Sequence, residues 1–408
     1  MTIKLLSLNT YNYLRGGSDA VFFEHDAMFH ELGWDTAIMA MHHPKNLKSR
    51  WEQYFVDEIE FGHKYTLLQK LTMSGKVIYS LEAKSKLAAL LEKFPADVAH
   101  AHCIYHHLSP SVLVELKQRG IPTVMTAHDL KLACPNYKMV NRTGICERCK
   151  NGNLLNVVRY RCVRDSIPTS ILIALESAIH KISGVYKKNL DRIVAPSLFM
   201  KNKLVEWGWD ESKIIHIPNY VQADRFSPNY KPGNYFVYFG RLQLDKGIGT
   251  VVKAAIAAGV NLHVIGTGPD EASIKRQATQ NGNVVFHGYL QGESLWRIIR
   301  DARAAILGSE IYENAPKSIL EAYSNGKPVI GARIGGIPEM VKEDETGFLF
   351  ESGDVDGLSE LLNSVADMPD DRLSAMGKAA REYVTEKFTE QHYRTEMMAL
   401  YRSLGVPC

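Results

Sequence analysis

The chain has 408 residues, of which 45% are hydrophobic and 23% charged, and its formal net charge is +3. That length is too great for one ordinary hydrophobic core and predicts two domains, while the composition is that of a soluble globular protein. No run of residues approaches the roughly 18 apolar positions of a membrane span. The first residues, MTIKLLSLNTYNY, lack the small-residue cleavage site of a signal peptide. We therefore expect a cytoplasmic protein.

The positive charge is concentrated in the first half of the chain. Residues 1–222 hold 28 Lys and Arg against 21 Asp and Glu, whereas the whole chain holds 48 against 45. A basic first half indicates an anionic partner there, such as a phosphorylated lipid or the inner face of a membrane. A solvated surface with a positive bias is the alternative.

Short β-rich runs alternate with helical stretches along the whole chain. The predicted strands of the first half are IKLLSLN, TAIMAM, DVAHAH, PTVMTA, RIVAPS and KIIHIP; those of the second half are YFVYFG, LHVIG, VVFHG, AAILGS, KPVIGA and GFLFE. This alternation is typical of βαβ units and parallel sheets, so we predict an α/β chain of two doubly wound domains. Prolines, asparagines and a glycine cluster in residues 218–235, where we place the boundary. Ligands of such sheets bind beyond the carboxyl ends of the strands.

A glycine pair follows the first predicted strand. Gly16 and Gly17 precede a helical stretch, and Ser18 is a candidate N-cap for that helix. Glycine lets the backbone approach a ligand closely, and a helix N-terminus attracts anions. The pattern is not the G-x-G-x-x-G of a dinucleotide site, and a Gly-Gly turn before a helix is common by itself.

Four histidines, His100, His102, His106 and His107, lie at the end of the third predicted strand. Imidazoles leaving a strand toward a ligand site bind hydroxyls or phosphates, and we expect this function rather than a metal site. A helix start with exposed histidines is the alternative.

Four cysteines lie in one segment with the spacing C-x11-C-x2-C-x12-C: Cys134, Cys146, Cys149 and Cys162. Four thiolates with one C-x2-C knuckle suit a tetrahedral structural zinc, which would help a strand-poor insert to fold. A cytosolic location disfavours disulfides. An iron–sulfur cluster and four reduced, unligated thiols are the alternatives.

Two cations follow the first predicted strand of the second half, in GRLQLDKG. Arg241 offers a planar fork and Lys246 a compact charge five residues later, a combination that suits a diphosphate. Two solvated surface cations are the alternative. Gly266 and Gly268 form a glycine turn after the next strand, which an ordinary βα turn would also explain.

The stretch YENAPKSILEAYSNGKPVI holds two glutamates, Glu313 and Glu321. We expect its helix to take Asn314 as N-cap and Pro316 in its first turn, and to end at Gly326. Glu313 then precedes the helix, and Glu321 lies in its second turn, placed to bind a vicinal diol. The free N–H groups of the first turn are ready for phosphate.

In this order the motifs resemble those of glycosyltransferase family 4, whose members are retaining enzymes of the GT-B fold. YENAPKSILEA is similar to the family's E-x7-E motif, and GRLQLDKG to its G-R-L-x-x-x-K-G. VIGTGP, GGIPEMV and TGFLF resemble its later loops, and RGGSD and TAHD its first-half motifs. The chain departs from the family at Ser18 and Asp19, where a glutamate is common. The resemblance covers nearly the whole chain.

The resemblance implies a GT-B fold, with two Rossmann-like domains facing across a cleft. Residues 1–220 would bind the acceptor and carry the cysteine insert at 130–165. Residues 221–385 would bind the nucleotide sugar, and residues 386–408 would form a helix that returns to the first domain.

The resemblance also implies roles for individual residues. Arg241 and Lys246 would hold the diphosphate of a nucleotide sugar, Glu321 the ribose, and Glu313 the donor sugar. His128 would face the reacting sugar from the first domain. The implied catalytic residues are His128, Arg241, Lys246 and Glu313. The donor-binding residues would be Gly16, Gly17, Arg241, Lys246, Gly266, Asn314, Ala315, Pro316 and Glu321.

The implied activity is transfer of a sugar from a nucleoside-diphosphate donor to a hydroxyl, with retention, in surface polysaccharide or glycoconjugate synthesis. The acceptor would be a glycan or a lipid-linked glycan, with peripheral membrane contact through the first domain and no nucleic acid. We expect no catalytic metal, because Arg, Lys and a helix N-terminus stabilise the leaving diphosphate. A nucleotide-sugar epimerase or hydrolase of the same fold, or a non-enzymatic nucleotide-sugar-binding protein, is the alternative.

Overall fold

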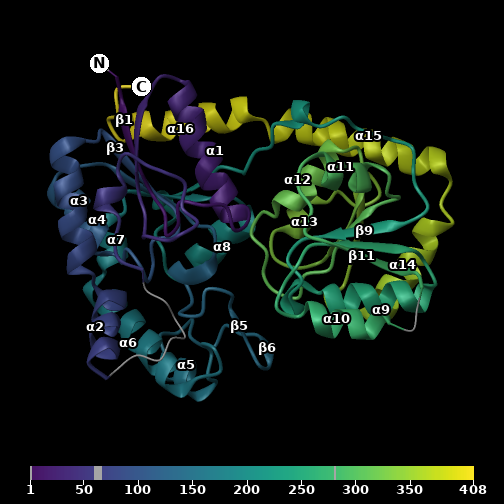
Figure 1. Ribbon diagram of the computed structural model, residues 1–408, viewed down its shortest axis with the longest axis horizontal. Helices are drawn as coiled ribbons and strands as arrows, with labels where there is room; N and C mark the ends of the chain where they lie inside the picture. Colours follow the sequence, from purple (N-terminus) through teal and green to yellow (C-terminus); the bar gives the residue numbers. More distant parts are fainter. Residues whose placement is uncertain (1, 59–66, 280–281) are drawn as a thin grey trace. The chain divides into compact units, whose positions relative to one another are not determined.

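The computed structural model describes residues 2–58, 67–279 and 282–408 and divides the chain into two compact units (Figure 1). Unit 1 comprises Met1–Ile217 and Arg394–Cys408, and unit 2 comprises Pro218–Tyr393. Each unit is built on a parallel sheet of six strands. The predicted cleft between the two domains stays a prediction.

The sheet of unit 1 has the strand order β2-β1-β3-β4-β7-β8, and all its pairings are parallel. Its strands coincide with the six runs predicted in the first half of the chain. They are β1 Lys4–Leu8, β2 Asp35–Met39, β3 Val98–Ala101, β4 Thr123–Thr126, β7 Arg192–Ala195 and β8 Ile214–His216. The central strands β3 and β4 are buried at every position, as expected of a parallel sheet covered on both faces.

Helices of unit 1 follow most of these strands. They are α1 Gly17–Glu31, α2 Leu67–Ile78, α3 Leu81–Lys93, α4 Ser111–Gln118, α5 Leu155–Arg159, α6 Ile167–Ser183, α7 Val185–Asn189 and α8 Leu198–Glu206. Helix α16, Glu390–Ser403, ends in this unit. The only strands of the insert after β4, all of which the structure describes, are the short antiparallel pair β5 Val140–Asn141 and β6 Gly144–Ile145, which agrees with a strand-poor segment.

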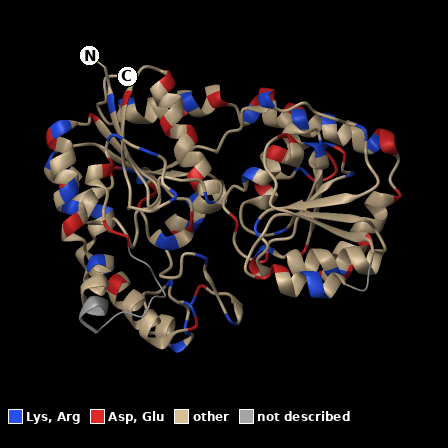
Figure 2. Cartoon of the chain, viewed as in Figure 1, with Lys and Arg blue, Asp and Glu red and all other residues tan. Residues whose placement is uncertain are grey.

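The sheet of unit 2 has the order β11-β10-β9-β12-β13-β14 and is also parallel. Its strands are β9 Phe236–Phe239, β10 Leu262–Ile265, β11 Val284–Gly288, β12 Ala305–Leu307, β13 Val329–Ala332 and β14 Gly347–Phe350. None of them contains Lys, Arg, Asp or Glu, so in Figure 2 the charge of this unit lies on its helices and loops. The six runs predicted in the second half are confirmed.

Helices cover both faces of the second sheet. Helices α9 Ile248–Ala258, α10 Glu271–Ala278 and α14 Val355–Ala366 pack together on one face (Figure 1). The other helices are α11 Glu293–Arg300, α12 Lys317–Ser324, α13 Ile337–Met340 and α15 Asp370–Lys387, of which α12 and α15 pack together.

Each sheet has one point where the strand order reverses direction. In unit 1 this point lies between β1 and β3, and in unit 2 between β9 and β12. The loops that leave neighbouring strands there diverge to opposite faces and open a crevice at the carboxyl edge, where doubly wound folds bind ligands. The topology therefore marks one candidate site in each unit.

Candidate functional site

The reversal point of unit 2 brings together residues from two predicted motifs. Lys246, in the loop after β9, places its Nζ 2.6 Å from Oε1 of Glu313, in the loop after β12. The Ser309 hydroxyl donates a hydrogen bond of 2.6 Å to the same carboxylate oxygen. A cation predicted to hold a diphosphate and a carboxylate predicted to hold a sugar are thus direct partners.

The backbone of Glu313 is held by the glycine loop that precedes α13. Its carbonyl accepts a hydrogen bond of 2.8 Å from the N–H of Gly336. Gly335 has a φ of +59°, and a Cβ there would lie 2.3 Å from the Glu313 carbonyl oxygen. Only glycine fits this position, so the GGIP motif serves to fix the glutamate loop.

The start of α12 differs in detail from the prediction. The helix begins at Lys317 with Pro316 as its N-cap residue, and no side chain caps it. The predictions that Asn314 is the N-cap and that Pro316 lies in the first turn are therefore wrong. A residue before proline disfavours the α region, so Ala315 does not continue a helix from Asn314. Glu321 lies in the second turn and Gly326, with a φ of +74°, ends the helix, as predicted. No side chain caps the first turn of α12, and the N-terminus of a helix attracts anions.

Of the other predicted donor residues of unit 2, Arg241 and Ala315 are accessible to solvent, whereas packing explains Gly266. Arg241 is exposed in the loop after β9, near Lys246 in the chain. Ala315 is partly exposed, and its carbonyl accepts a hydrogen bond from Asn219 Nδ2. Gly266, in contrast, has a structural reason to be glycine, since a Cβ there would lie 1.9 Å from the Gly240 carbonyl oxygen.

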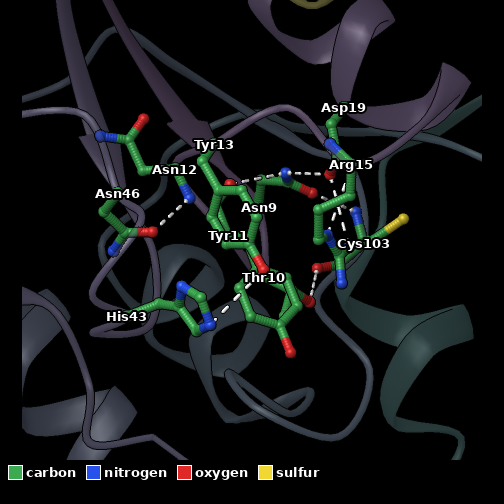
Figure 3. Close-up of polar contacts among 10 residues, drawn as sticks. All are labelled: Asn9, Thr10, Tyr11, Asn12, Tyr13, Arg15, Asp19, His43, Asn46 and Cys103. Atoms are coloured by element: carbon green, nitrogen blue, oxygen red, sulfur yellow. Dashed lines mark hydrogen bonds and ion pairs between the residues drawn. The ribbon is translucent and has the colours of Figure 1, made fainter. Parts of the chain in front are cut away.

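The reversal point of unit 1 is lined by a polar loop that continues β1 (Figure 3). Asn9 Nδ2 donates to the buried carboxylate of Asp19 at 3.2 Å, and Asn9 Oδ1 accepts from the N–H of Cys103, beyond β3. The Thr10 hydroxyl donates to the Cys103 carbonyl at 2.5 Å. The Arg15 guanidinium stacks 3.7 Å from the centre of the Tyr11 ring. The bonds of Asn9 and Thr10 to Cys103 join the ends of β1 and β3 into one rim.

Gly16 and Gly17 lie exposed on this rim. The φ of Gly16 is −176°, and no atom would lie within 4 Å of a Cβ at either position. Neither backbone conformation nor packing requires glycine at these two positions. The prediction that Ser18 caps α1 is wrong: the helix begins at Gly17, and Asp19 reaches back to accept a hydrogen bond from the Arg15 N–H.

Four imidazoles form a row, the histidine stack, which runs from three buried rings, His25 on α1, His100 and His102, to the partly buried His128 beyond β4. Successive ring centres lie 4.3, 4.8 and 5.1 Å apart. Tyr401 of α16 places its hydroxyl 2.6 Å from His100 Nδ1 and 3.0 Å from His25 Nε2.

Protein partners occupy both nitrogens of His100, because its Nε2 lies 2.7 Å from the Thr126 hydroxyl. The expectation that this imidazole binds a ligand is therefore wrong. His100 and His102 are fully buried, so the alternative of exposed histidines fails for both.

His128 is held by His102, whose Nδ1 lies 2.8 Å from His128 Nε2. Burial lowers the pKa of His128 to about 4 and that of His102 well below its ordinary value. Both rings are therefore neutral at pH 7, and one of the two bonded nitrogens must carry the shared proton. A neutral, oriented imidazole can exchange hydrogen bonds with a sugar hydroxyl.

The four cysteines of the insert line one small pocket together with Asn136, Val140 and Val157. All six cysteines of the chain are free thiols. Within the described residues, no group of three or more His, Cys, Asp or Glu is arranged to hold a metal ion. The fold thus gathers the predicted ligands without showing a formed metal site.

Sequence reasoning missed several residues of the unit 1 site. Asn9 and Thr10 had a usable signal, since polar residues directly after a buried strand lie at the carboxyl edge of its sheet. His25 and Tyr401 had none, because only the folded chain places them beside His100, and Tyr401 is 301 positions away from it.

Two family models match the chain. Glycosyltransferase Family 4 matches residues 15–225, which is more than half of the chain, and Glycosyl transferases group 1 matches residues 222–383. The chain therefore belongs to Glycosyltransferase Family 4, and it is a glycosyltransferase.

Curated relatives and solved structures agree with this assignment. The chain is 23% identical to N-acetyl-alpha-D-glucosaminyl L-malate synthase of Bacillus anthracis, over 95% of the chain and 93% of the relative. It is 34% identical to sulfoquinovosyl transferase SQD2 of Arabidopsis thaliana, over 77% of the chain and 58% of the relative.

Among solved structures, sucrose-phosphate synthase of Thermosynechococcus elongatus superposes with a TM-score of 0.72 at 18% identity, covering 100% of both chains. HepE of Anabaena, in complex with UDP-glucose, superposes with a TM-score of 0.68 at 15% identity, covering 98% of this chain and 100% of the other. The two units are the two halves of a GT-B fold.

Proposed function

We propose that this glycosyltransferase moves a sugar from a nucleoside-diphosphate donor to a hydroxyl of a glycan or lipid-linked glycan, with retention of configuration. The observation that supports it best is the 2.6 Å pair of Lys246 and Glu313 at the reversal point of unit 2. It joins the G-R-L-x-x-x-K-G and E-x7-E motifs in one place, next to the uncapped start of α12.

Unit 2 supplies the donor site in this proposal. Arg241, Lys246 and the N-terminus of α12 take the diphosphate, and Glu321, one turn further along the helix, takes the ribose hydroxyls. Glu313 takes the donor sugar. As the glycosidic bond breaks, negative charge grows on the leaving diphosphate, and these preorganised positive groups stabilise it without a divalent cation.

Unit 1 supplies the acceptor site. Gly16 and Gly17 let the β1–α1 loop approach the diphosphate, and the neutral imidazole of His128 faces the reacting sugar. The hydroxyl attacks on the face that the leaving phosphate vacates, and that phosphate accepts the hydroxyl proton. The UDP-glucose in the HepE complex supports a nucleotide sugar as the ligand, whereas the different names of the relatives support no single acceptor.

The test begins with a thermal-shift screen of nucleoside diphosphates and their sugars, since a bound ligand raises the midpoint of unfolding. Turnover of the best donor is then measured with Arg241→Ala and Lys246→Ala. Each should lose roughly 100-fold in turnover, as is typical when one preorganised charge is removed. Lys253→Ala, which removes an exposed cation from α9, is the control. Full turnover in both site variants contradicts the assignment, and NMR of the product decides its anomeric configuration.

We further propose that the cysteine pocket binds one structural zinc. The support is its donor set: four thiols converge in an insert with little core of its own. Bound there, zinc would cross-link the insert through Cys134, Cys146, Cys149 and Cys162. Metal analysis of protein purified without chelator should find about one zinc per chain. Iron in its place, or no metal, contradicts this proposal, and Cys149→Ser should lower thermal stability more than Cys408→Ser.

The same assays decide the other reactions of this fold. An epimerase or hydrolase consumes the donor without an acceptor, and a binding protein does not consume it. The comparisons favour neither, because the relatives quoted above bear transferase or synthase names.

A further inference from the structure

Helix α6 turns polar side chains toward the interior of unit 1 and aliphatic side chains toward solvent. The side chains that it buries are Ser170, Ile173, Glu176 and His180, three of which are polar. Its exposed large hydrophobic side chains are five aliphatic ones: Ile167 is 44% exposed, Ile171 51%, Leu175 51%, Ile179 40% and Ile182 87%. An ordinary surface helix shows the opposite arrangement.

The exposed side chains form one continuous ridge, which we call the α6 ridge (Ile167, Ile171, Leu175, Ile179 and Ile182). At about 100° per residue their spacing of four, four, four and three keeps them within an arc of roughly 120°. The ridge is about 23 Å long at 1.5 Å per residue. Apolar residues scattered singly over a surface need no explanation, but an aligned row of this length marks an interaction site.

The inward face of α6 is fixed by polar contacts, so the helix cannot turn its ridge inward. Glu176 lies 2.7 Å from Lys131 Nζ and 3.1 Å from His106 Nδ1. His180 Nε2 lies 2.7 Å from the carbonyl oxygen of Ile78 at the end of α2. Rotating the helix would strand a buried carboxylate without its cation, at a cost of several kcal/mol, so the outward orientation is a feature of the folded state.

The charges at both ends of the ridge are positive. Arg161 and Arg164 precede α6 and are exposed, as are Lys181, Lys187 and Lys188 at its other end. Residues 155–190 contain two acids: Glu176 is buried, and Asp165 pairs with Arg142. An apolar row with cations at its ends matches the chemistry of an anionic bilayer surface, where acyl chains lie beneath acidic headgroups.

We propose that the α6 ridge is a docking surface for an anionic lipid bilayer, on which α6 lies parallel to the membrane plane. A second copy of the chain fits less well. The five side chains, at about half of full exposure, offer on the order of 300 Å², against roughly 800 Å² per partner in a stable protein interface. The positive ends would also repel each other in a symmetric pair. The helix has 17 residues and buries a carboxylate, so it lies on a bilayer rather than crossing it. Across the described ranges, none of the helices combines the length and apolarity that crossing a bilayer requires.

The test is co-sedimentation of the full chain with phosphatidylcholine vesicles, with and without phosphatidylglycerol. Wild-type protein should bind the anionic vesicles. Ile171→Gln with Leu175→Gln should reduce binding by about tenfold or more, because it removes the centre of the ridge. Leu47→Gln with Leu81→Gln is the matched control, since these leucines are 59% and 73% exposed elsewhere in unit 1. Circular dichroism and the unfolding midpoint should be unchanged in both variants.

The charge contribution has its own pair of variants. Lys181→Gln with Lys188→Gln should weaken binding roughly tenfold at low salt and much less at high salt. Lys45→Gln with Lys48→Gln removes the same charge from another exposed site and should bind as wild type does.

The inference is overturned if wild-type protein ignores anionic vesicles, or if the ridge variant binds them fully. It is also overturned if sedimentation velocity shows a dimer for the wild-type protein and a monomer for the ridge variant, while neither binds vesicles. In that case the α6 ridge contacts a second copy of the chain and not a bilayer. Vesicle binding is measured without donor or acceptor, so this result is independent of the sugar-transfer assays.

Discussion

Removing the negative charge of Glu313 should separate binding of the nucleoside diphosphate from transfer of the sugar. The Glu313 carboxylate lies 2.6 Å from the Lys246 ammonium, and the two side chains are 15% and 33% exposed, respectively. A diphosphate must therefore compete with the carboxylate for this cation. A pair with this much solvent contact contributes on the order of 1 kcal/mol.

Glu313→Gln should accordingly tighten binding of the nucleoside diphosphate by up to about fivefold, since 1.4 kcal/mol is a factor of ten. Turnover should fall by roughly 100-fold, because the contact to the donor sugar is lost. Glu321→Gln should instead weaken binding of the nucleoside diphosphate by about 10- to 100-fold, which is the contribution of a charge-assisted hydrogen bond to the ribose.

Isothermal titration calorimetry with the best nucleoside diphosphate, beside initial rates with its sugar, measures both effects. Glu310→Gln is the matched control. It removes a charge from the same loop, but its carboxylate bonds to the Thr250 hydroxyl at 2.7 Å and not to Lys246. Glu313→Gln could instead weaken binding of the nucleoside diphosphate as much as Glu321→Gln does. That result would refute the idea that Glu313 competes with the diphosphate for Lys246.

Three further predictions concern stability. Burial lowers the pKa of His25 to about 3 and that of His128 to about 4, so the histidine stack is neutral when folded and takes up protons on unfolding. Below pH 6.5 the unfolded state binds more protons than the folded state. The free energy of unfolding should therefore fall as the pH is lowered from 7.5 to 5.5, by on the order of 1 kcal/mol per histidine. A midpoint of unfolding that is unchanged or higher at pH 5.5 would refute this. Tyr401→Phe removes the hydroxyl bonded to His100 and should cost about 1–3 kcal/mol in urea unfolding; wild-type stability would show that the bond contributes nothing. Gly335→Ala should lower both the unfolding midpoint and turnover, since its Cβ would meet the Glu313 carbonyl oxygen. Gly353→Ala is the control: Gly353 has a φ of +81° and no atom within 4 Å of its Cβ, so this variant should lower the midpoint alone.

The sequence alone determined the local structure of this protein and its family. All twelve strands of the two sheets coincide with predicted runs. Short β-rich runs that alternate with helical stretches mark strands from local sequence alone. The glycine loops, the GRLQLDKG and YENAPKSILEA motifs and the cysteine spacing were equally readable, since each depends on residues close together in the chain. The two N-cap predictions were wrong, because α1 begins at Gly17 after Gly16, and α12 begins at Lys317 after Pro316.

Only the tertiary structure decided which distant groups meet. Lys246 and Glu313 are 67 positions apart and pair because β9 and β12 are neighbours, an order that crossovers set and local sequence does not encode. His100 and Tyr401 meet only after α16 packs into unit 1. Helix α6 is the clearest case. Its sequence has the period of an amphipathic helix, which predicts the apolar side inward. The buried bonds of Glu176 and His180 hold the polar side inward instead, because a buried charge must keep its partner, and so the aliphatic ridge faces out.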